Sequence, residues 1–117
     1  MAGYKAARLS EDVRRELSLL VRDLKDPRIK NNMISIVRVE MANDGSFAKA
    51  YVSAMEGMTA AKLAVKALSG ASGRLRRDIA NKLHLRKAPE IRFLPDDSME
   101  YSARLGEMLE DLRRDEE

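Results

Sequence analysis

Residues 68–87 read LSGASGRLRRDIANKLHLRK, a stretch in which glycines interrupt an otherwise helical pattern. Gly70 and Gly73 are three residues apart, and six of the fourteen residues at positions 74–87 are lysine or arginine. Glycine lets the backbone turn sharply and leaves no side chain at the bend. The stretch therefore predicts two helices joined by a kink at residues 71–73, with positive charge concentrated after the kink.

The second of these helices is expected from about Arg74 to about Leu83. It would begin at the kink, where free backbone N–H groups and the positive end of the helix dipole attract phosphate. Ser72 is a candidate to cap this helix or to donate its hydroxyl to a phosphate, and Gly73 is expected to adopt a positive φ. Leu75 and the apolar residues one and two turns further on are expected to face the core, which places the basic side chains outside.

The kink and the helix after it thus predict a surface that binds the phosphate backbone of a nucleic acid. The residues assigned to this surface are Ser72, Gly73, Arg74, Arg76, Arg77, Lys82, Arg86 and Lys87, and the kink itself is formed by Ala71, Ser72 and Gly73. Arg14 and Arg15 on an earlier helix are expected to extend it. A plain joint between two helices is the alternative, in which a glycine ends the first helix and the basic face is only solvated.

Two related motifs do not fit the spacing. A DNA-binding helix-turn-helix uses a turn of about three to four residues, and the connection here is tighter and follows a strand hairpin that does not belong to that fold. The letters SGASGR lack the glycine spacing and the Gly-Lys-Ser/Thr ending of a nucleotide-binding P-loop.

Composition sets the class of protein. The 117 residues fit one domain, and the absence of cysteine excludes disulfides and thiolate metal sites and favours a reducing cytoplasm. The N-terminal stretch has no apolar signal core, and no segment is expected to span a membrane. From position 95 to the end there are nine acidic and three basic residues, a net charge of −6, so positions 1–94 carry +9. This asymmetry suggests a polyanionic partner, although solvated helix faces would give the same count.

The flanking sequence predicts the remaining elements. Apolar residues recur every three or four positions from Leu9 to Leu24, which predicts an amphipathic helix with Ser10 as its N-cap and with Asp26-Pro27 at its end. The segments ISIVRVEM (34–41) and FAKAYVS (47–53) read as two strands, and the Asp-Gly pair between them predicts a hairpin turn. The side chains expected on the covered face of this hairpin are Val37, Val39, Met41, Ala48, Ala50 and Val52.

Residues 59–69 predict the helix before the kink, with Thr59 as a candidate cap. Its expected apolar face consists of Ala60, Leu63, Ala64, Ala67 and Leu68. The segment APEIRFLP then predicts a short strand between two prolines, and Asp97 or Ser98 is expected to cap a last helix. That helix carries Tyr101, Leu105, Met108, Leu109 and Leu112 and ends in the letters RRDEE, which lack an apolar face and are expected to be frayed.

The element order helix, strand, strand, helix, helix, strand, helix indicates an α+β fold with helices on one face of a three-stranded sheet. We expect residues 1–98 to form the domain and residues 99–117 to add a C-terminal helix and acidic tail rather than a second domain.

Other candidate sites have weaker support. His84 is the only histidine and has no acidic or cysteine neighbour, so we expect a helix-end residue that at most assists nucleic-acid binding. Asp96 and Asp97 are expected to be caps, although together with Glu100 they leave open a metal-dependent nuclease. Phe47 and Tyr51 share a strand face, which allows base stacking but gives it little support.

Five stretches in order resemble the ribosome-binding factor A family, a variant of the bacterial type II K-homology fold in which an Ala-x-Gly kink replaces the Gly-x-x-Gly loop. They are RLSEDVRREL, DPRI, the strand pair ISIVRVEM and FAKAYVS, LRKAPEIRF, and DDSMEYSARL, with Ala71-Ser72-Gly73 as the kink. The first few residues and those after Glu107 match nothing in the family pattern.

The resemblance implies a non-catalytic, monomeric and cytoplasmic factor without metal or cofactor that binds the small (30S) ribosomal subunit and 16S rRNA late in assembly. It also implies a role in maturing the 5′ end of 16S rRNA and in growth in the cold, together with other assembly factors including a GTPase. A general K-homology protein that binds RNA or DNA without a ribosomal role is the second reading.

Overall fold

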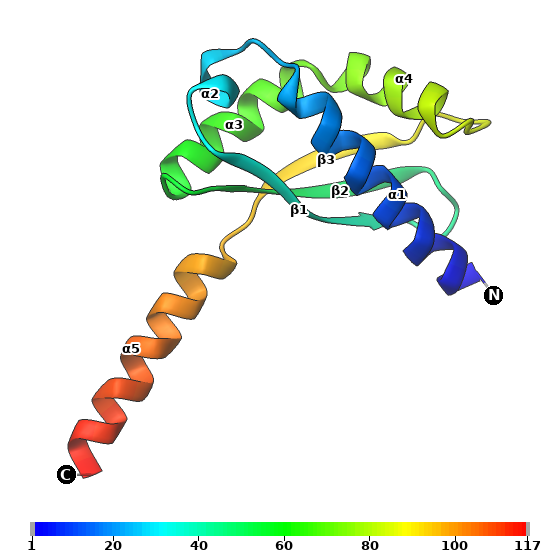
Figure 1. The fold of residues 1–117 in the computed structure, drawn as a ribbon. Helices are drawn as coiled ribbons and strands as arrows, with labels where there is room; N and C mark the ends of the chain where they lie inside the picture. Colours follow the sequence, from blue (N-terminus) through cyan, green and yellow to red (C-terminus); the bar gives the residue numbers. More distant parts are fainter. Residues whose placement is uncertain (1, 117) are drawn as a thin grey trace.

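The computed structural model describes residues 2–116 and has the predicted order of elements with one addition (Figure 1). The elements are α1 (Ala2–Arg22), α2 (Pro27–Lys30), β1 (Ile34–Met41), β2 (Phe47–Ala54), α3 (Met58–Gly70), α4 (Ser72–Lys82), β3 (Glu90–Pro95) and α5 (Ser98–Glu116). The α+β class and the three-stranded sheet are therefore confirmed.

The addition is the four-residue helix α2, which follows the end of α1 at Arg22. Asp26 is its N-cap and accepts a hydrogen bond from the backbone N–H of Arg28 at 2.9 Å, while Pro27 takes the first helical position. Proline suits that position because its missing N–H would have no partner there. The Asp-Pro pair therefore starts a new helix instead of only ending α1.

The sheet has the order β1-β2-β3, with β2 in the centre. β1 and β2 are antiparallel and are joined by the predicted turn, in which Gly45 has a φ of 73° and Asp44 accepts a hydrogen bond from the Ser46 N–H at 3.0 Å. β3 pairs parallel to β2 after the crossover through α3 and α4. Strand β2 thus has hydrogen-bonded neighbours on both sides.

A β-bulge in β1 corrects the predicted face of Val37. Ile36 pairs with Val52 and Arg38 pairs with Tyr51, so Val37 is the extra residue. Its side chain is 46% exposed, whereas Ile36 and Val39 are both buried. Strict alternation would have placed Val37 with Val39, but a bulge shifts the pleat by one residue.

The helices α1, α3 and α4 cover one face of the sheet (Figure 1). α1 packs on β1 and α4, and α3 packs on β2 and β3. Ala48 and Ala50 of β2 and Ala64 of α3 are fully buried. Small side chains at these positions let α3 approach the sheet closely, as the alanines in the strand predicted.

Several predicted helix details are wrong. Ser10 lies inside α1, where its Oγ donates to the Ala6 carbonyl at 2.7 Å and accepts the Met41 N–H at 3.0 Å, so it ties α1 to β1 instead of capping it. α3 begins at Met58 with Gly57 as N-cap, not with Thr59. Leu63 is 42% exposed because the helix turns Ala61 inward instead.

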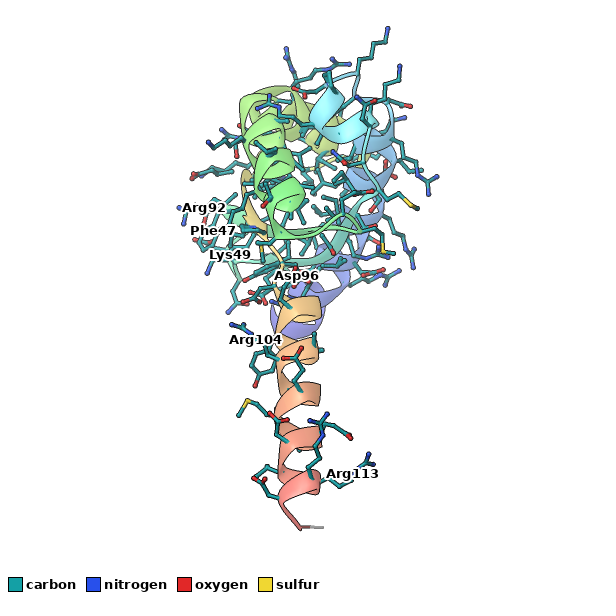
Figure 2. The ribbon with its side chains drawn as sticks, turned by 90° about the vertical axis from the view of Figure 1, so that its left-hand side faces the viewer. Phe47, Lys49, Arg92, Asp96, Arg104 and Arg113 are labelled. Atoms are coloured by element: carbon teal, nitrogen blue, oxygen red, sulfur yellow. The ribbon has the colours of Figure 1, made fainter. Side chains whose placement is uncertain are left out.

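The last helix, α5, begins at Ser98, one of the two residues expected to cap it, and projects away from the body on the side opposite the other helices (Figure 1). Arg104 and Arg113 lie along it, at a distance from the sheet (Figure 2). Tyr101, Leu105, Met108, Leu109 and Leu112 of this helix are exposed, so they do not contribute to the core. The helix continues to Glu116, so the described part of the RRDEE end is helical rather than frayed, and Glu117 lies outside the described residues.

Candidate nucleic-acid interface

The break between α3 and α4 is a single residue. α3 ends at Gly70, α4 begins at Ser72, and Ala71 between them has φ −97° and ψ 5°. The Ala71 N–H donates to the Ala67 and Leu68 carbonyls, and the Ala71 carbonyl accepts the Leu75 N–H at 3.0 Å. The bend is therefore tight and is held by backbone hydrogen bonds on both sides.

Two expectations about this bend are corrected. Ser72 does not cap α4, because it is already the first residue of that helix. The N-cap position is taken by Ala71, and no side chain makes a capping hydrogen bond there. Among the described residues, positive φ angles occur at Gly45, Gly57 and His84, and not at Gly73. The backbone angles of Ala71 are open to any L-residue, so the turn does not need a glycine in a left-handed conformation.

Gly73 instead leaves space at the start of α4. A Cβ built on it would have nothing within 4 Å, and the residue is exposed. A ligand backbone could therefore come close to the first N–H groups of α4, which point away from the helix body and carry the positive end of its dipole.

The basic side chains of α4 point in several outward directions. Leu75 and Ile79 are buried, and with about 100° between successive residues Arg74 and Arg77 lie on the opposite side of the helix. Arg74 is 72% exposed and has only a long ion pair with Asp78, at 3.9 Å. Lys82 is exposed at the end of the helix. These three cations are available to a partner.

Arg76 has a structural role as well. Its Nε donates to the Ala88 carbonyl at 3.0 Å, which ties α4 to the segment before β3. Arg86 and Lys87 in that segment are exposed, so the contact brings them to the same side of the body as α4. Lys87 also contributes to lowering the pKa of Asp44, after the hydrogen bonds that Ser46 donates to that carboxylate.

Arg14 does not join these cations. It lines a groove formed by α1 and β1, and α4 packs against α1 and β3, so Arg14 lies on the other flank of α1. Its Nε donates to Glu11 Oε2 at 3.0 Å, and this hydrogen bond lowers the pKa of Glu11. Arg15 is exposed, 3.7 Å from the same carboxylate. The pairing of Arg14 was not foreseen, although a glutamate three residues before an arginine on a helix signals it.

The remaining candidates have structural roles. His84 has a φ of 53° just after α4, and the next N–H, from Leu85, donates to the Ala80 carbonyl, which is the Schellman arrangement that ends a helix. Asp96 accepts a hydrogen bond from Ser98 Oγ, and the Asp97 carbonyl accepts the Tyr101 N–H at 2.9 Å, so both acids lie at the start of α5.

Within residues 2–116, no three His, Cys, Asp or Glu side chains gather in a way that could hold a metal ion. Helices of the length and apolar content needed to cross a membrane are also absent from the described residues.

Sequence reasoning missed two arginines on the uncovered face of the sheet. The guanidinium of Arg38 lies over the ring of Tyr51, and that of Arg92 lies over the ring of Phe47. The hairpin register, counted back from the Asp-Gly turn, places Arg38 opposite Tyr51 and could have revealed the first pair. The second depends on the parallel register of β3, which the sequence does not specify.

Comparison with known proteins gives one consistent similarity. The family model for ribosome-binding factor A matches residues 5–109. Ribosome-binding factor A of Clostridium tetani is 36% identical over 118 aligned positions, covering 100% of this chain and 97% of that protein. The protein of the same name from Heliobacterium modesticaldum is 41% identical, covering 96% of this chain and 92% of its relative.

Solved structures agree with the sequence comparison. The crystal structure of ribosome-binding factor A from Thermus thermophilus superimposes with a TM-score of 0.68 at 31% identity, covering 77% of this chain and 94% of that chain. A Thermus thermophilus ribosome-binding factor A model fitted into a cryo-EM map of its complex with the 30S subunit gives a TM-score of 0.65 at 30% identity, covering 79% and 96%.

Proposed function

The chain belongs to the ribosome-binding factor A family, and on that premise we propose that it binds the small ribosomal subunit as an assembly factor without catalytic activity. The existence of a 30S complex of the Thermus thermophilus relative supports the partner. The observation in this chain that carries the proposal is the kink at Ala71 followed by exposed cations on α4. This is the chemistry that a ribose-phosphate backbone requires.

In the proposed contact, the start of α4 faces a phosphate of 16S rRNA. The first N–H groups of the helix donate to the phosphate oxygens, and the open surface at Gly73 allows the close approach. Arg74, Arg77 and Lys82 neutralise neighbouring phosphates, and Arg86 and Lys87 continue the basic surface beyond the end of α4. Shape and backbone contacts dominate over base reading because exposed lysine and arginine side chains contact phosphates, which carry no sequence information.

Family membership supports a finer proposal. We propose that the protein acts as a cytoplasmic monomer late in subunit assembly, assists maturation of the 5′ end of 16S rRNA, and supports growth in the cold. Its release would depend on other assembly factors, including a GTPase. Measuring the fraction of unprocessed 16S rRNA at low temperature, in cells with and without the protein, tests these roles.

The binding experiment uses charge reversal on α4. Arg76 is left intact because it holds Ala88, so the test variant is Arg74→Glu, Arg77→Glu and Lys82→Glu. We expect this variant to fold normally and to lose co-sedimentation with immature small subunits, because the reversed charges repel the phosphates that the cations would neutralise. Each lost phosphate contact should also lower the slope of binding affinity against salt concentration by about one unit.

The matched control reverses Arg104, Arg113 and Arg114 on α5, which changes the net charge equally but leaves α4 untouched. Loss of subunit binding in the control alone, or full binding by the α4 variant, would show that the interface is misplaced. Equal affinity of the wild type for immature subunits and for unrelated RNA would favour a general RNA-binding protein instead.

A further inference from the structure

The face of the sheet opposite α1, α3 and α4 carries an ordered set of aromatic and basic side chains. Strand β2 turns Ala48 and Ala50 into the core, so Phe47, Lys49 and Tyr51 point to the uncovered face. All three side chains are partly exposed. Figure 2 shows Phe47 and Lys49 next to Arg92 on one side of the body.

Each ring is covered by an arginine from a different neighbouring strand. The Cζ atom of Arg38 on β1 lies 4.2 Å from the ring centroid of Tyr51, and that of Arg92 on β3 lies 4.6 Å from the ring centroid of Phe47. Each guanidinium group therefore lies over its ring, since both distances are within the range of a cation–π contact.

Both guanidinium groups are also held from the side. Arg38 pairs with Glu40 at 3.3 Å, and Arg92 pairs with Glu90 at 3.4 Å. Exposed pairs of this kind add little to stability. Their effect here is to help hold each guanidinium over its ring, and the side chains of Arg38 and Arg92 stay more than half exposed to solvent.

Lys49 lies between the two stacks. It stands opposite Glu40 on one side and Arg92 on the other in the sheet register. Phe47 and Tyr51 are four residues apart on β2, a separation of about 13 Å along the strand. Two ring–guanidinium pairs thus flank one cation on the central strand of the sheet.

We propose that this face is a second RNA-binding site, which takes a short single-stranded segment by stacking two bases on the arginine-covered rings of Phe47 and Tyr51, with Lys49 neutralising a phosphate between them. Bases stack well on aromatic rings and on guanidinium planes alike. The site is separate from α4. The proposal depends on the proposed function only in that both have RNA as the partner.

The chemistry of the face favours RNA over a protein partner. The exposed aliphatic side chains of the three strands are Val37 at the bulge and Leu94 near the end of β3, whereas the centre of the uncovered face is formed by the covered rings and by Lys49. Protein interfaces concentrate uncharged apolar side chains at their centre. A centre of flat cations and a lysine instead matches a partner with planar bases and negative phosphates.

The test follows the aromatic side chains of the full chain by NMR during titration with single-stranded hexauridylate or hexa-adenylate. We expect the ring signals of Phe47 and Tyr51 to shift, and those of Phe93, which is buried on the covered face, to stay constant. Unchanged Phe47 and Tyr51 signals at saturation would overturn the proposal, and this readout needs no variant to fold.

Substitutions measure how much each side chain contributes to oligonucleotide affinity. Phe47→Leu and Tyr51→Leu should each weaken oligonucleotide binding about tenfold, whereas Tyr51→Phe should retain it. Lys49→Gln should reduce the salt slope by about 0.7, the value for one phosphate of a single strand. Arg113→Gln on α5 is the matched loss of one exposed cation and should change nothing. Wild-type affinity in both leucine variants would refute stacking.

The α4 charge-reversal variant separates this proposal from the proposed function. If the sheet site is real, that variant keeps the ring shifts of Phe47 and Tyr51 with the oligonucleotide even though it no longer binds subunits. Ring shifts that disappear with the α4 cations would show that the oligonucleotide binds at α4, and would refute the sheet site while leaving the proposed function intact.

Discussion

Replacing Gly73 with alanine should stabilise the fold, because this glycine is the second residue of α4 and does not have a positive φ. The added Cβ would have nothing within 4 Å. Alanine loses less conformational entropy on folding and has the higher helix propensity. We expect the free energy of unfolding to rise by about 0.5–1 kcal/mol.

The matched substitution is Gly57→Ala, at the other glycine next to a helix start. Gly57 has φ 113° and ψ −175°, a region that is essentially restricted to glycine. A Cβ would again meet no neighbour, so backbone strain alone sets the effect. We expect the free energy of unfolding to fall by about 1–3 kcal/mol.

Urea unfolding followed by circular dichroism measures both changes, and thermal unfolding should show Tm higher by about 2–5 °C for Gly73→Ala. If Gly73→Ala destabilises the protein as much as Gly57→Ala does, the helix start is not formed as described and the reasoning about the kink fails. Subunit binding measured on the same variant is a separate question, since a methyl group at Gly73 would obstruct the approach of a phosphate without harming the fold.

Three further predictions concern other parts of the fold. His84→Gly should raise the free energy of unfolding by up to about 1 kcal/mol in urea titrations, because glycine adopts the left-handed φ of this position without the strain that histidine has there. No gain in stability would contradict the left-handed geometry after α4. Ala64→Leu should lower it by about 1–3 kcal/mol, because no space remains between α3 and the sheet, and a neutral result would mean that the core is loosely packed. The Arg28 side chain and N–H lower the pKa of Asp26 to about 2, so the stability it provides is complete above pH 4 and is lost between pH 4 and pH 2. Unfolding at several pH values should therefore show the difference between wild type and Asp26→Asn disappearing over that range, and a constant difference would refute the pairing.

Periodicity and turn signals were sufficient for the architecture. The alternation in FAKAYVS, the Asp-Gly turn and the apolar spacing of the helices identified the strands, the hairpin and the covered face. These signals are local, and each requires only that one side of an element be buried. Local signals also placed the joint between α3 and α4 within residues 71–73, although α4 begins two residues earlier than expected, at Ser72.

Details that depend on tertiary contacts were not predictable in this way. The bulge at Val37 arises because Ile36 and Val39 must both reach the core, and nothing in ISIVRVEM marks the extra residue. Serine is a residue type that is favoured at an N-cap, yet α1 continues through Ser10, whose hydroxyl bonds to Ala6 and Met41 instead. The apolar spacing of α5 resembles a buried stripe, but the helix leaves the body at β3.

In the candidate site too, local sequence signals predicted some features, and others depend on tertiary contacts. That the cations of α4 would be exposed could be read from the Leu75 and Ile79 stripe, since the helix has only one apolar side. The contact of Arg76 with Ala88 and the pairing of Arg14 with Glu11 required coordinates. The arginine stacks on the sheet depend on strand register, which a single sequence specifies only near the hairpin turn.

The most direct test of the central claim, that the start and outer side of α4 face rRNA, uses the absence of cysteine in the chain. A single cysteine at exposed Asn81, between Arg77 and Lys82, can carry an iron chelate that cleaves nearby RNA with hydroxyl radicals. A cysteine at exposed Asn31, after α2, is the comparison. On immature small subunits we expect strong local cleavage of 16S rRNA from position 81 and weak or no cleavage from position 31; the reverse pattern would contradict the placement of the interface.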